Sequence, residues 1–380
     1  MRKPITIGDL GTIITGKTPP TTNKNYYGDY AVFIKPTDIS EQCKFTYETE
    51  EMYSKLAAEK YESSLIPKGA ICVPCIGTIG TKMTMAPCDC YTNQSINSIV
   101  CNDRYDNEYV YYLIKNFLPG LKSYNLGTAS GREYVSKSNF EKIELVAEQD
   151  KTIQKKIGEF LSRYDSLIEN YQKQIKVLEE AAQRLYKKWF VDLHFPGHEN
   201  TKIVDGVPEG WEKKMVGEIT PIKTGKKDAN YGTEEGAYPF FTCAQEPIKA
   251  PSYSFDTSAV ILAGNGDFNV KLYRGRFEAY QRTYVLEPTN EKMLYLLYFC
   301  ISENMNRLAT GASGSTIKFL TKGMIESLVI NEPSINVLNS FNHIIEPIRT
   351  QKENFQSQIR LLTEARDRLL PKLMSGEIEI

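Results

Sequence analysis

KTIQKKIGEFLSRYDSLIENYQKQIKVLEEAAQRLYKKWF, residues 151–190, is the stretch that decides the fold. It contains no proline, and its only glycine is Gly158. Apolar and aromatic residues recur at alternating spacings of three and four, with one polar break. These seam positions are Ile157, Phe160, Tyr164, Leu167, Tyr171, Gln174, Leu178, Ala181 and Leu185. Such a heptad pattern predicts one long helix, roughly 57 Å in length, that packs against another helix.

A second copy of this helix is expected near the end of the chain. FQSQIRLLTEARDRLLPK, from Phe355, matches YQKQIKVLEEAAQRLYKK, from Tyr171, at about half of its positions and at an offset of about 184 residues. The corresponding seam positions are Phe355, Gln358, Leu362 and Leu369. The polar break is duplicated at Gln174 and Gln358, and such a residue can fix the register of paired helices. The match extends to residues outside the seam, which indicates duplication rather than two unrelated amphipathic helices.

The segments before the two helices also resemble each other. VGEI at 216–219 mirrors IGDL at 7–10, and TGK at 224–226 mirrors TGK at 15–17. We expect strands at 7–16, 31–35 and 70–75, a helix at 109–122, and a corresponding helix at 291–308. GASG at 311–314 mirrors TASG at 128–131. The chain therefore reads as a mixed α/β globule followed by a long helix, written twice.

These patterns predict the domain organisation and the fold class. The first globule covers residues 1–150, and the first long helix covers 151–190. A linker rich in Pro and Gly covers 191–210. The second globule covers 211–333, and the second helix and tail cover 334–380. We expect a mixed α/β (α+β) protein with a pseudo-two-fold internal repeat, in which two globular domains are joined by two long antiparallel coiled-coil helices.

Composition limits the possible classes of protein. A length of 380 residues suggests two or three domains, and the 41% hydrophobic content allows well-formed cores. The net charge is −1, so any surface that binds nucleic acid must be local. The longest apolar run, 293–301, is too short to span a membrane, and the N-terminus does not resemble a secretory signal. Eight scattered cysteines favour a cytoplasmic location over a disulfide framework.

Several motifs resemble those of one family, the specificity subunits of type I restriction–modification systems. RDRLLPKLMSGEI at 366–378 is similar to the end of the family's second helical region. WFVD at 189–192, FPG at 195–197 and VPEGW at 207–211 resemble its passage from the first helix to the second recognition domain. KGAI at 68–71 and IGTIGTK at 76–82 resemble a loop of its recognition domains.

The resemblance implies a function without catalysis. Each globule would be a target recognition domain that reads one half of a bipartite sequence in double-stranded DNA. The antiparallel helices would set the gap between the half-sites and would dock two methyltransferase subunits. Translocase and nuclease subunits would join the complex for restriction. The resemblance implies no cofactor and no metal.

Two other functions remain possible from the residues alone. GTIITGKT at 11–18 fits the P-loop pattern and would make Lys17 and Thr18 nucleotide contacts. However, Thr-Ile-Ile-Thr favours a strand, Pro19 and Pro20 do not open a helix, and the repeat has Thr220 in place of the first glycine. A coiled-coil adaptor that binds only proteins is the other alternative.

Further motifs give only weak indications of a metal or catalytic site. Cys72, Cys75, Cys88 and Cys90 could suggest zinc, but a CxC pair is unusual, and a free cysteine is also a common core residue. The three histidines do not have the spacing of a metal or catalytic set. Asp205, Glu212 and Lys214 mimic a nuclease pattern, but the pattern spans a linker and the start of a domain, so chance explains it better. The chain contains no Asn-Pro-Pro-Tyr or Asn-Pro-Pro-Phe methyltransferase motif.

The candidate DNA contacts are basic and amide side chains in predicted loops. Arg can bind guanine and Asn or Gln can bind adenine through paired hydrogen bonds, whereas Lys mostly contacts phosphates. In the first globule the candidates are Lys17, Asn23, Lys24, Thr78, Lys82, Arg132 and Lys137. In the second they are Lys226, Lys227, Asn265, Lys271, Arg274, Arg276, Gln281, Arg282, Lys318 and Lys322. Any single one of them could equally be an ordinary solvated side chain.

Overall fold

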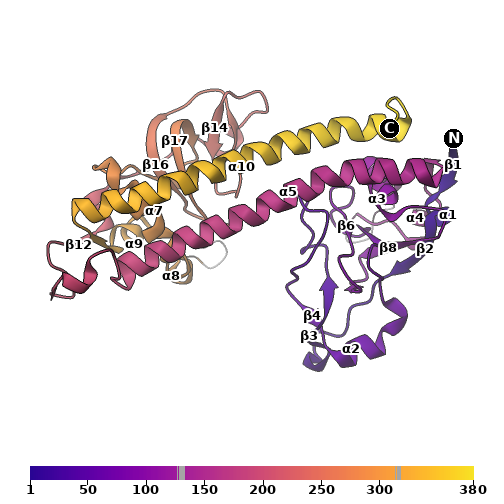
Figure 1. The fold of residues 1–380 in the computed structure, drawn as a ribbon, viewed down its shortest axis with the longest axis horizontal. Coiled ribbons are helices and arrows are strands. Elements are labelled where there is room, and N and C mark those ends of the chain that lie inside the picture. Colours follow the sequence, from indigo (N-terminus) through magenta and orange to yellow (C-terminus); the bar gives the residue numbers. More distant parts are fainter. Residues whose placement is uncertain (126, 128–132, 313, 315–317) are drawn as a thin grey trace. The chain divides into compact units, whose positions relative to one another are not determined.

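The computed structural model describes residues 1–125, 127, 133–312, 314 and 318–380. It divides into two compact units, each with its own core (Figure 1). Unit 1 comprises Met1–Lys173 and Phe355–Ile380, and unit 2 comprises Gln174–Asn354. Each unit therefore contains one globule together with part of each long helix.

The globule of unit 1 is built from three small sheets. β1 pairs antiparallel with β9, a second sheet has the order β2-β8-β5-β6, and a third has the order β4-β3-β7. The strands are β1 (Arg2–Thr6), β2 (Gly11–Thr15), β3 (Tyr27–Ile34), β4 (Met52–Tyr53), β5 (Ile71–Pro74), β6 (Thr84–Met85), β7 (Tyr91–Thr92), β8 (Ile96–Cys101) and β9 (Glu144–Glu148). The helices are α1 (Ile7–Leu10), α2 (Lys55–Lys60), α3 (Asn107–Phe117) and α4 (Lys137–Glu141). In Figure 1, α3 lies beside α5 (Lys151–Tyr186), whereas β3, β4 and α2 lie at the far end of the globule.

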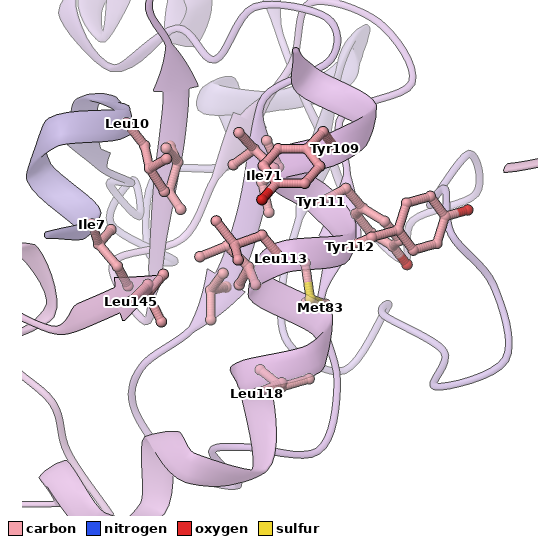
Figure 2. Packing of buried hydrophobic residues seen from close by; sticks show 14 of the residues in the cluster. Ile7, Leu10, Ile71, Met83, Tyr109, Tyr111, Tyr112, Leu113, Leu118 and Leu145 are labelled. Carbon is pink, nitrogen blue, oxygen red and sulfur yellow. The ribbon is translucent and has the colours of Figure 1, made fainter. Parts of the chain in front are cut away.

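The core of unit 1 is organised around α3. Asp106 caps this helix by accepting a hydrogen bond from the amide of Tyr109 at 3.0 Å. Tyr109 and Leu113 pack into the same cluster as Ile71 of β5, while the rings of Tyr111 and Tyr112 contact each other edge to face (Figure 2). Gly158 of α5 allows the two helices to approach closely, because a Cβ there would lie 2.9 Å from the amide nitrogen of Tyr109.

Unit 2 repeats this order with a larger sheet. β12 pairs with β19 as β1 pairs with β9, and the main sheet has the order β13-β18-β16-β17-β14-β15. The strands are β10 (Ile203–Val204), β11 (Val207–Pro208), β12 (Glu212–Met215), β13 (Ile222–Thr224), β14 (Tyr238–Phe241), β15 (Ile248–Ala250), β16 (Phe255–Ala263), β17 (Val270–Ala279), β18 (Thr283–Leu286) and β19 (Val329–Glu332). The helices are α6 (Val216–Ile219), α7 (Leu294–Glu303), α8 (Met305–Gly311), α9 (Lys322–Glu326) and α10 (Ile335–Ser375). Along the chain, α6, β13, α7 and α9 correspond to α1, β2, α3 and α4.

Two expectations about these elements are corrected by the structure, and the expected linker contains a short hairpin. Residues 7–10 form a helical turn and not a strand, because Thr6 and Asp9 make a reciprocal capping box. The helix expected at 291–308 is broken at Asn304, which separates α7 from α8. The expected linker is partly ordered, since Asp205 and Gly206, both with positive φ, turn a hairpin between β10 and β11.

Within each unit, α5 and α10 run antiparallel. In unit 1, Asp165 of α5 contacts Arg366 of α10. The rings of Tyr171 on α5 and Phe355 on α10 stack with their centroids 4.9 Å apart. The hydroxyl of Tyr171 also donates to Oε1 of Gln358 at 3.4 Å. In unit 2, Lys352 Nζ pairs with Glu179 Oε1 at 2.5 Å, and the ring of Phe341 contacts Trp189 of the π-helical turn Lys187–Val191.

The most buried stripe of α5 lies about one position away from the expected seam. Leu167 is 46% exposed, whereas Leu161 and Ile168 are fully buried. The displacement has a physical reason: in unit 1, Leu161 packs in one core cluster with residues of α3 as well as of α10. Of the other expected pairing residues, Ile157 is buried, and Gln174 and Gln358 are exposed. The half-buried ones are Phe160, Tyr164, Tyr171, Leu178, Leu185, Phe355, Leu362 and Leu369.

In the described part of the chain, no helix combines the length and the apolar character that a membrane span requires.

Candidate nucleic-acid interface

A closely packed glycine opens the same loop in both globules. A Cβ on Gly16 would lie 2.2 Å from the carbonyl oxygen of Thr92, and one on Gly225 would lie 1.9 Å from that of Ala279. Any side chain at these positions would require the backbone to move. The loops that follow β2 and β13 therefore cross directly over the segments that lead into β8 and β18.

Backbone hydrogen bonds gather several loops of unit 1 at this point. The amide of Lys17 donates to Thr92 O at 2.9 Å, and the amide of Cys75 donates to Ser95 O at 2.7 Å. The amide of Val135 donates to Cys75 O at 2.9 Å. These contacts define loop cluster 1, which comprises residues 16–18, 75–78, 92–95 and 133–135.

Unit 2 forms loop cluster 2 from the corresponding loops. The amide of Gly264 donates to Arg282 O at 2.9 Å, and the amide of Leu320 donates to Gly264 O at 2.8 Å. The amide of Gln281 donates to Lys227 O at 2.9 Å. Loop cluster 2 comprises residues 225–227, 264–265, 279–282 and 318–320. Gly264 takes the place of Cys75 in two of these hydrogen bonds, whereas the bond from Gln281 to Lys227 joins the same two loops as that from Lys17 to Thr92 but in the opposite direction.

Eight of the predicted DNA contacts lie in these clusters. Asn265 is half-buried and accepts a hydrogen bond from the Sγ of Cys243 at 2.7 Å. The ammonium of Lys227 lies 4.2 Å from the ring centroid of Tyr231. The remaining ones are exposed: Lys17, Thr78, Lys226, Gln281 and Arg282. Lys318, also exposed, is an eighth member by position, because it begins the segment that pairs with residue 265.

Several other predicted contacts are engaged in internal interactions. Arg274 pairs with Glu346 at 2.9 Å, and Arg276 pairs with Asp256 at 3.0 Å. Lys271 donates to Ala244 O at 2.8 Å, and burial lowers the pKa of its ammonium group. These three side chains stabilise unit 2 directly, so their basic character alone does not mark a DNA contact.

The other predicted contacts lie outside the clusters. Lys137 and Lys322 are the first residues of α4 and α9, and each pairs with a glutamate four residues later on its own helix. Asn23 and Lys24 lie at the start of a short 3₁₀ helix, and Lys82 lies between β5 and β6. Arg132 is outside the described residues.

Sequence reasoning missed Gln94. This exposed side chain lies in loop cluster 1 at the position that Gln281 occupies in loop cluster 2, two residues after the carbonyl that covers the glycine. The hydroxyl of Thr18 contacts its side-chain oxygen. The only signal in the sequence is a glutamine two residues before a β-branched residue in both repeats. A match of this length does not by itself align the two segments.

The structure gives no support for nucleotide or zinc binding. Residues 11–15 form β2, and no helix follows Gly16 and Lys17 to face a phosphate. Burial raises the pKa of Cys72 to about 11 and that of Cys75 to about 12, which favours the thiol over the metal-binding thiolate. Among the described residues, no group of three or more His, Cys, Asp and Glu side chains could hold a metal.

The residues that mimic a nuclease pattern have a structural explanation. Asp205, Glu212 and Lys214 line a cavity of about 600 Å³ beside Trp211. Lys214 is paired with Glu212 at 3.1 Å and also contacts Glu332 across the β12–β19 pair. Its ammonium therefore supports the junction of the two strands and is not available for catalysis.

Comparison with known proteins gives the family. The model of the type I restriction modification DNA specificity domain matches residues 3–180 and again residues 208–357, so the chain belongs to this family. Specificity subunits are the non-catalytic members of type I systems, and neither the nucleotide-binding nor the adaptor alternative is supported.

Individual relatives agree with this assignment. The chain is 27% identical to the type I restriction enzyme MjaIX specificity subunit of Methanocaldococcus jannaschii, over 98% of this chain and 93% of that protein. It is 36% identical to the EcoDI specificity subunit of Escherichia coli, over 45% of this chain and 39% of that protein. The crystal structure of a type I system S subunit from M. genitalium shares the fold, with a TM-score of 0.61, 18% identity and coverage of 98% and 96%.

Proposed function

We propose that loop clusters 1 and 2 are the surfaces with which this specificity subunit reads two separate halves of one DNA target. The observation that carries the proposal is the correspondence of the two clusters: the same loops meet over the same glycine in each unit. A protein that presents one reading surface twice suits a target with two half-sites. The first recognition domain would comprise residues 1–150 and the second residues 211–333.

The exposed side chains in the clusters divide into two chemical roles. Gln94 and Gln281 carry amides that can bind adenine through paired hydrogen bonds, and Arg282 can bind guanine in the same way. Lys17, Lys226 and Lys318 would contact phosphates and fix the orientation of the domain. Backbone hydrogen bonds between the loops support the segments that carry these side chains.

The long helices would set the distance between the half-sites. Segments of α5 and α10 pair antiparallel within each unit, and helices provide a nearly rigid rise of about 1.5 Å per residue. We further infer that two methyltransferase subunits dock on these helices and that restriction subunits join that assembly. The duplicated helical sequence supports a partner that binds twice.

The test is single-molecule sequencing of methylated bases in the native host, with and without the gene. We expect one split motif with an undefined gap to lose its adenine methylation when the gene is deleted, and to regain it when the gene is supplied on a plasmid. A host that carries an active methyltransferase of this system and shows the same methylation in both strains would disprove the proposal.

A further inference from the structure

A buried polar contact joins the first globule to both long helices within unit 1. Tyr112 of α3 donates its hydroxyl to one carboxylate oxygen of Asp165 on α5. The other oxygen of Asp165 accepts from Arg366 on α10. The side chains of Asp165 and Arg366 are only 3% and 4% exposed, so this is a buried ion pair with a tyrosine as its third member.

Unit 2 has the same three chemical groups. Tyr295 of α7 donates its hydroxyl to Glu346 of α10, and Glu346 also accepts from Arg274 of β17 at 2.9 Å. The guanidinium of Arg274 lies 5.2 Å from the ring centroid of Tyr295. Arg349 of α10 donates to the hydroxyl of Tyr295 at 3.5 Å.

The two tyrosines occupy the same place in the repeat. Each is the sixth residue of an Asn-Glu segment, NEYVYY at 107–112 and NEKMLY at 290–295. In both units the carboxylate lies on the long helix that follows the globule in sequence. Asp165 lies 14 residues after the first residue of α5 (165 − 151), and Glu346 lies 11 residues after the first of α10 (346 − 335). The difference of three residues is about one helical turn.

Stability alone does not explain this arrangement. An apolar contact of similar volume is often at least as stabilising as a buried ion pair, since both charges must be desolvated. Such pairs have a better-attested role in fixing one register against its alternatives, because another register would leave the buried charge of Asp165 without its partner. In unit 2, where Arg274 is 34% and Glu346 47% exposed, the argument rests instead on the matching geometry of the three side chains.

We propose that Tyr112–Asp165–Arg366 and Tyr295–Glu346–Arg274 are two positioning latches, each of which fixes the rotation and the axial position of one recognition domain on the helix that follows it. The inference rests on the proposed function and deepens it: the latches convert a fixed helix length into a fixed gap between half-sites. Without a latch, the domain stays folded and reads the same bases, but its position along the helix varies.

The experiment uses the full complex with its methyltransferase subunits and a plasmid library in which the gap of the split target varies. Tyr112→Phe and Tyr295→Phe each remove one hydroxyl and keep the ring. Tyr111→Phe and Tyr298→Phe are the matched controls on the same two helices.

For the latch variants we expect unchanged half-sites and about a tenfold fall in the preference for the natural gap over gaps one base pair longer or shorter. A change of this size is typical for the loss of one charge-assisted hydrogen bond. The control variants keep the wild-type preference.

Hydrogen exchange on the same preparations shows whether a latch has opened. Faster exchange in α3 or α7, together with an unchanged gap preference, would overturn the inference and leave the latch a stabilising contact only. Asp165→Asn is a second variant that tests the same latch through its carboxylate. A wild-type complex that methylates no split target would instead contradict the proposed function, so the two failures can be told apart.

Discussion

Glu346 is a residue whose contribution to stability depends on pH. Burial of this carboxylate opposes ionisation, but hydrogen bonds from Tyr295 and Arg274 and the charges of Arg274 and Arg349 outweigh burial, so its pKa is lowered from the ordinary value of 4.5. A carboxylate with a lowered pKa stabilises the folded state above its unfolded-state pKa, and this contribution disappears as the pH falls through the folded-state pKa.

Glu346→Gln should therefore destabilise unit 2 at pH 7 but not in acid. Because the side chain is 47% exposed, solvent screening limits the expected loss to about 0.5–1 kcal/mol. Urea unfolding followed by tryptophan fluorescence measures it, since Trp189 and Trp211, the two tryptophans of the chain, are both buried in unit 2. Glu326→Gln, which removes an exposed pair on α9, is the control. A loss that persists at pH values well below the folded-state pKa would contradict this assignment.

The glutamines of the loop clusters should determine specificity separately. Gln94→Ala should relax selection at one base pair of one half-site, and Gln281→Ala should relax selection in the other half-site. The expected loss of discrimination is about 1–3 kcal/mol at that base pair, because each change removes one paired hydrogen bond to a base. Methylation of a randomised target library measures it. Loss of selectivity at both half-sites from either single substitution would contradict separate reading.

Lys17 and Lys226 should behave differently from the glutamines. Lys17→Ala or Lys226→Ala should weaken DNA binding equally for all sequences and reduce the slope of log affinity against log salt by about one, because a single phosphate contact is lost. Binding of the assembled complex to matched and mismatched duplexes at several salt concentrations is the measurement. Lys322→Ala, on the first residue of α9 and outside the clusters, should leave the slope unchanged.

At the scale of elements, the sequence predicts local features better than contacts between distant segments. The two long helices, the repeat and the strand at 11–15 follow from periodicity and from residue type. The buried stripe of α5 did not follow, because Leu161 shares a core cluster with residues of α3 as well as of α10, and a heptad seam assumes a single partner. The sequence did not predict the loop clusters either. They form because β2 pairs with β8, and β13 pairs with β18, and long segments of sequence separate the strands of each pair.

The long helices lead to a prediction about spacing. Insertion of seven residues into each of α5 and α10, near Glu169 and Glu353, adds about 10.5 Å, or roughly three base pairs of DNA. Seven residues turn a helix through nearly two full turns, so each side chain keeps its facing direction. The methylated motif should keep both half-sites and acquire a longer gap. Insertion of five residues in each helix, which turns the following segment by about 140°, should abolish methylation. Changed half-sites after the seven-residue insertion would refute the role of the helices.

At the scale of the whole molecule, each unit has the parts that it needs to fold and to present its loops. The core around α3 belongs to unit 1, and the core around α7 belongs to unit 2. In the described residues, each loop cluster is held by hydrogen bonds from its own globule. The latch of each unit likewise uses residues of that unit alone. The two globules can therefore diverge in their loops while both remain attached to helices of similar sequence.

This independence predicts that specificity can be exchanged one half at a time. Replacement of residues 211–333 by the second recognition domain of another specificity subunit should change one half-site and leave the other half-site and the gap unchanged. Residues 274 and 295 must remain arginine and tyrosine in the chimaera, because both side chains contact Glu346 of the retained helix. A matched chimaera with phenylalanine at residue 295 should read the same two half-sites with a less defined gap. Sequencing of methylated bases distinguishes these results, and a chimaera in which both half-sites change would show that the two units read DNA jointly.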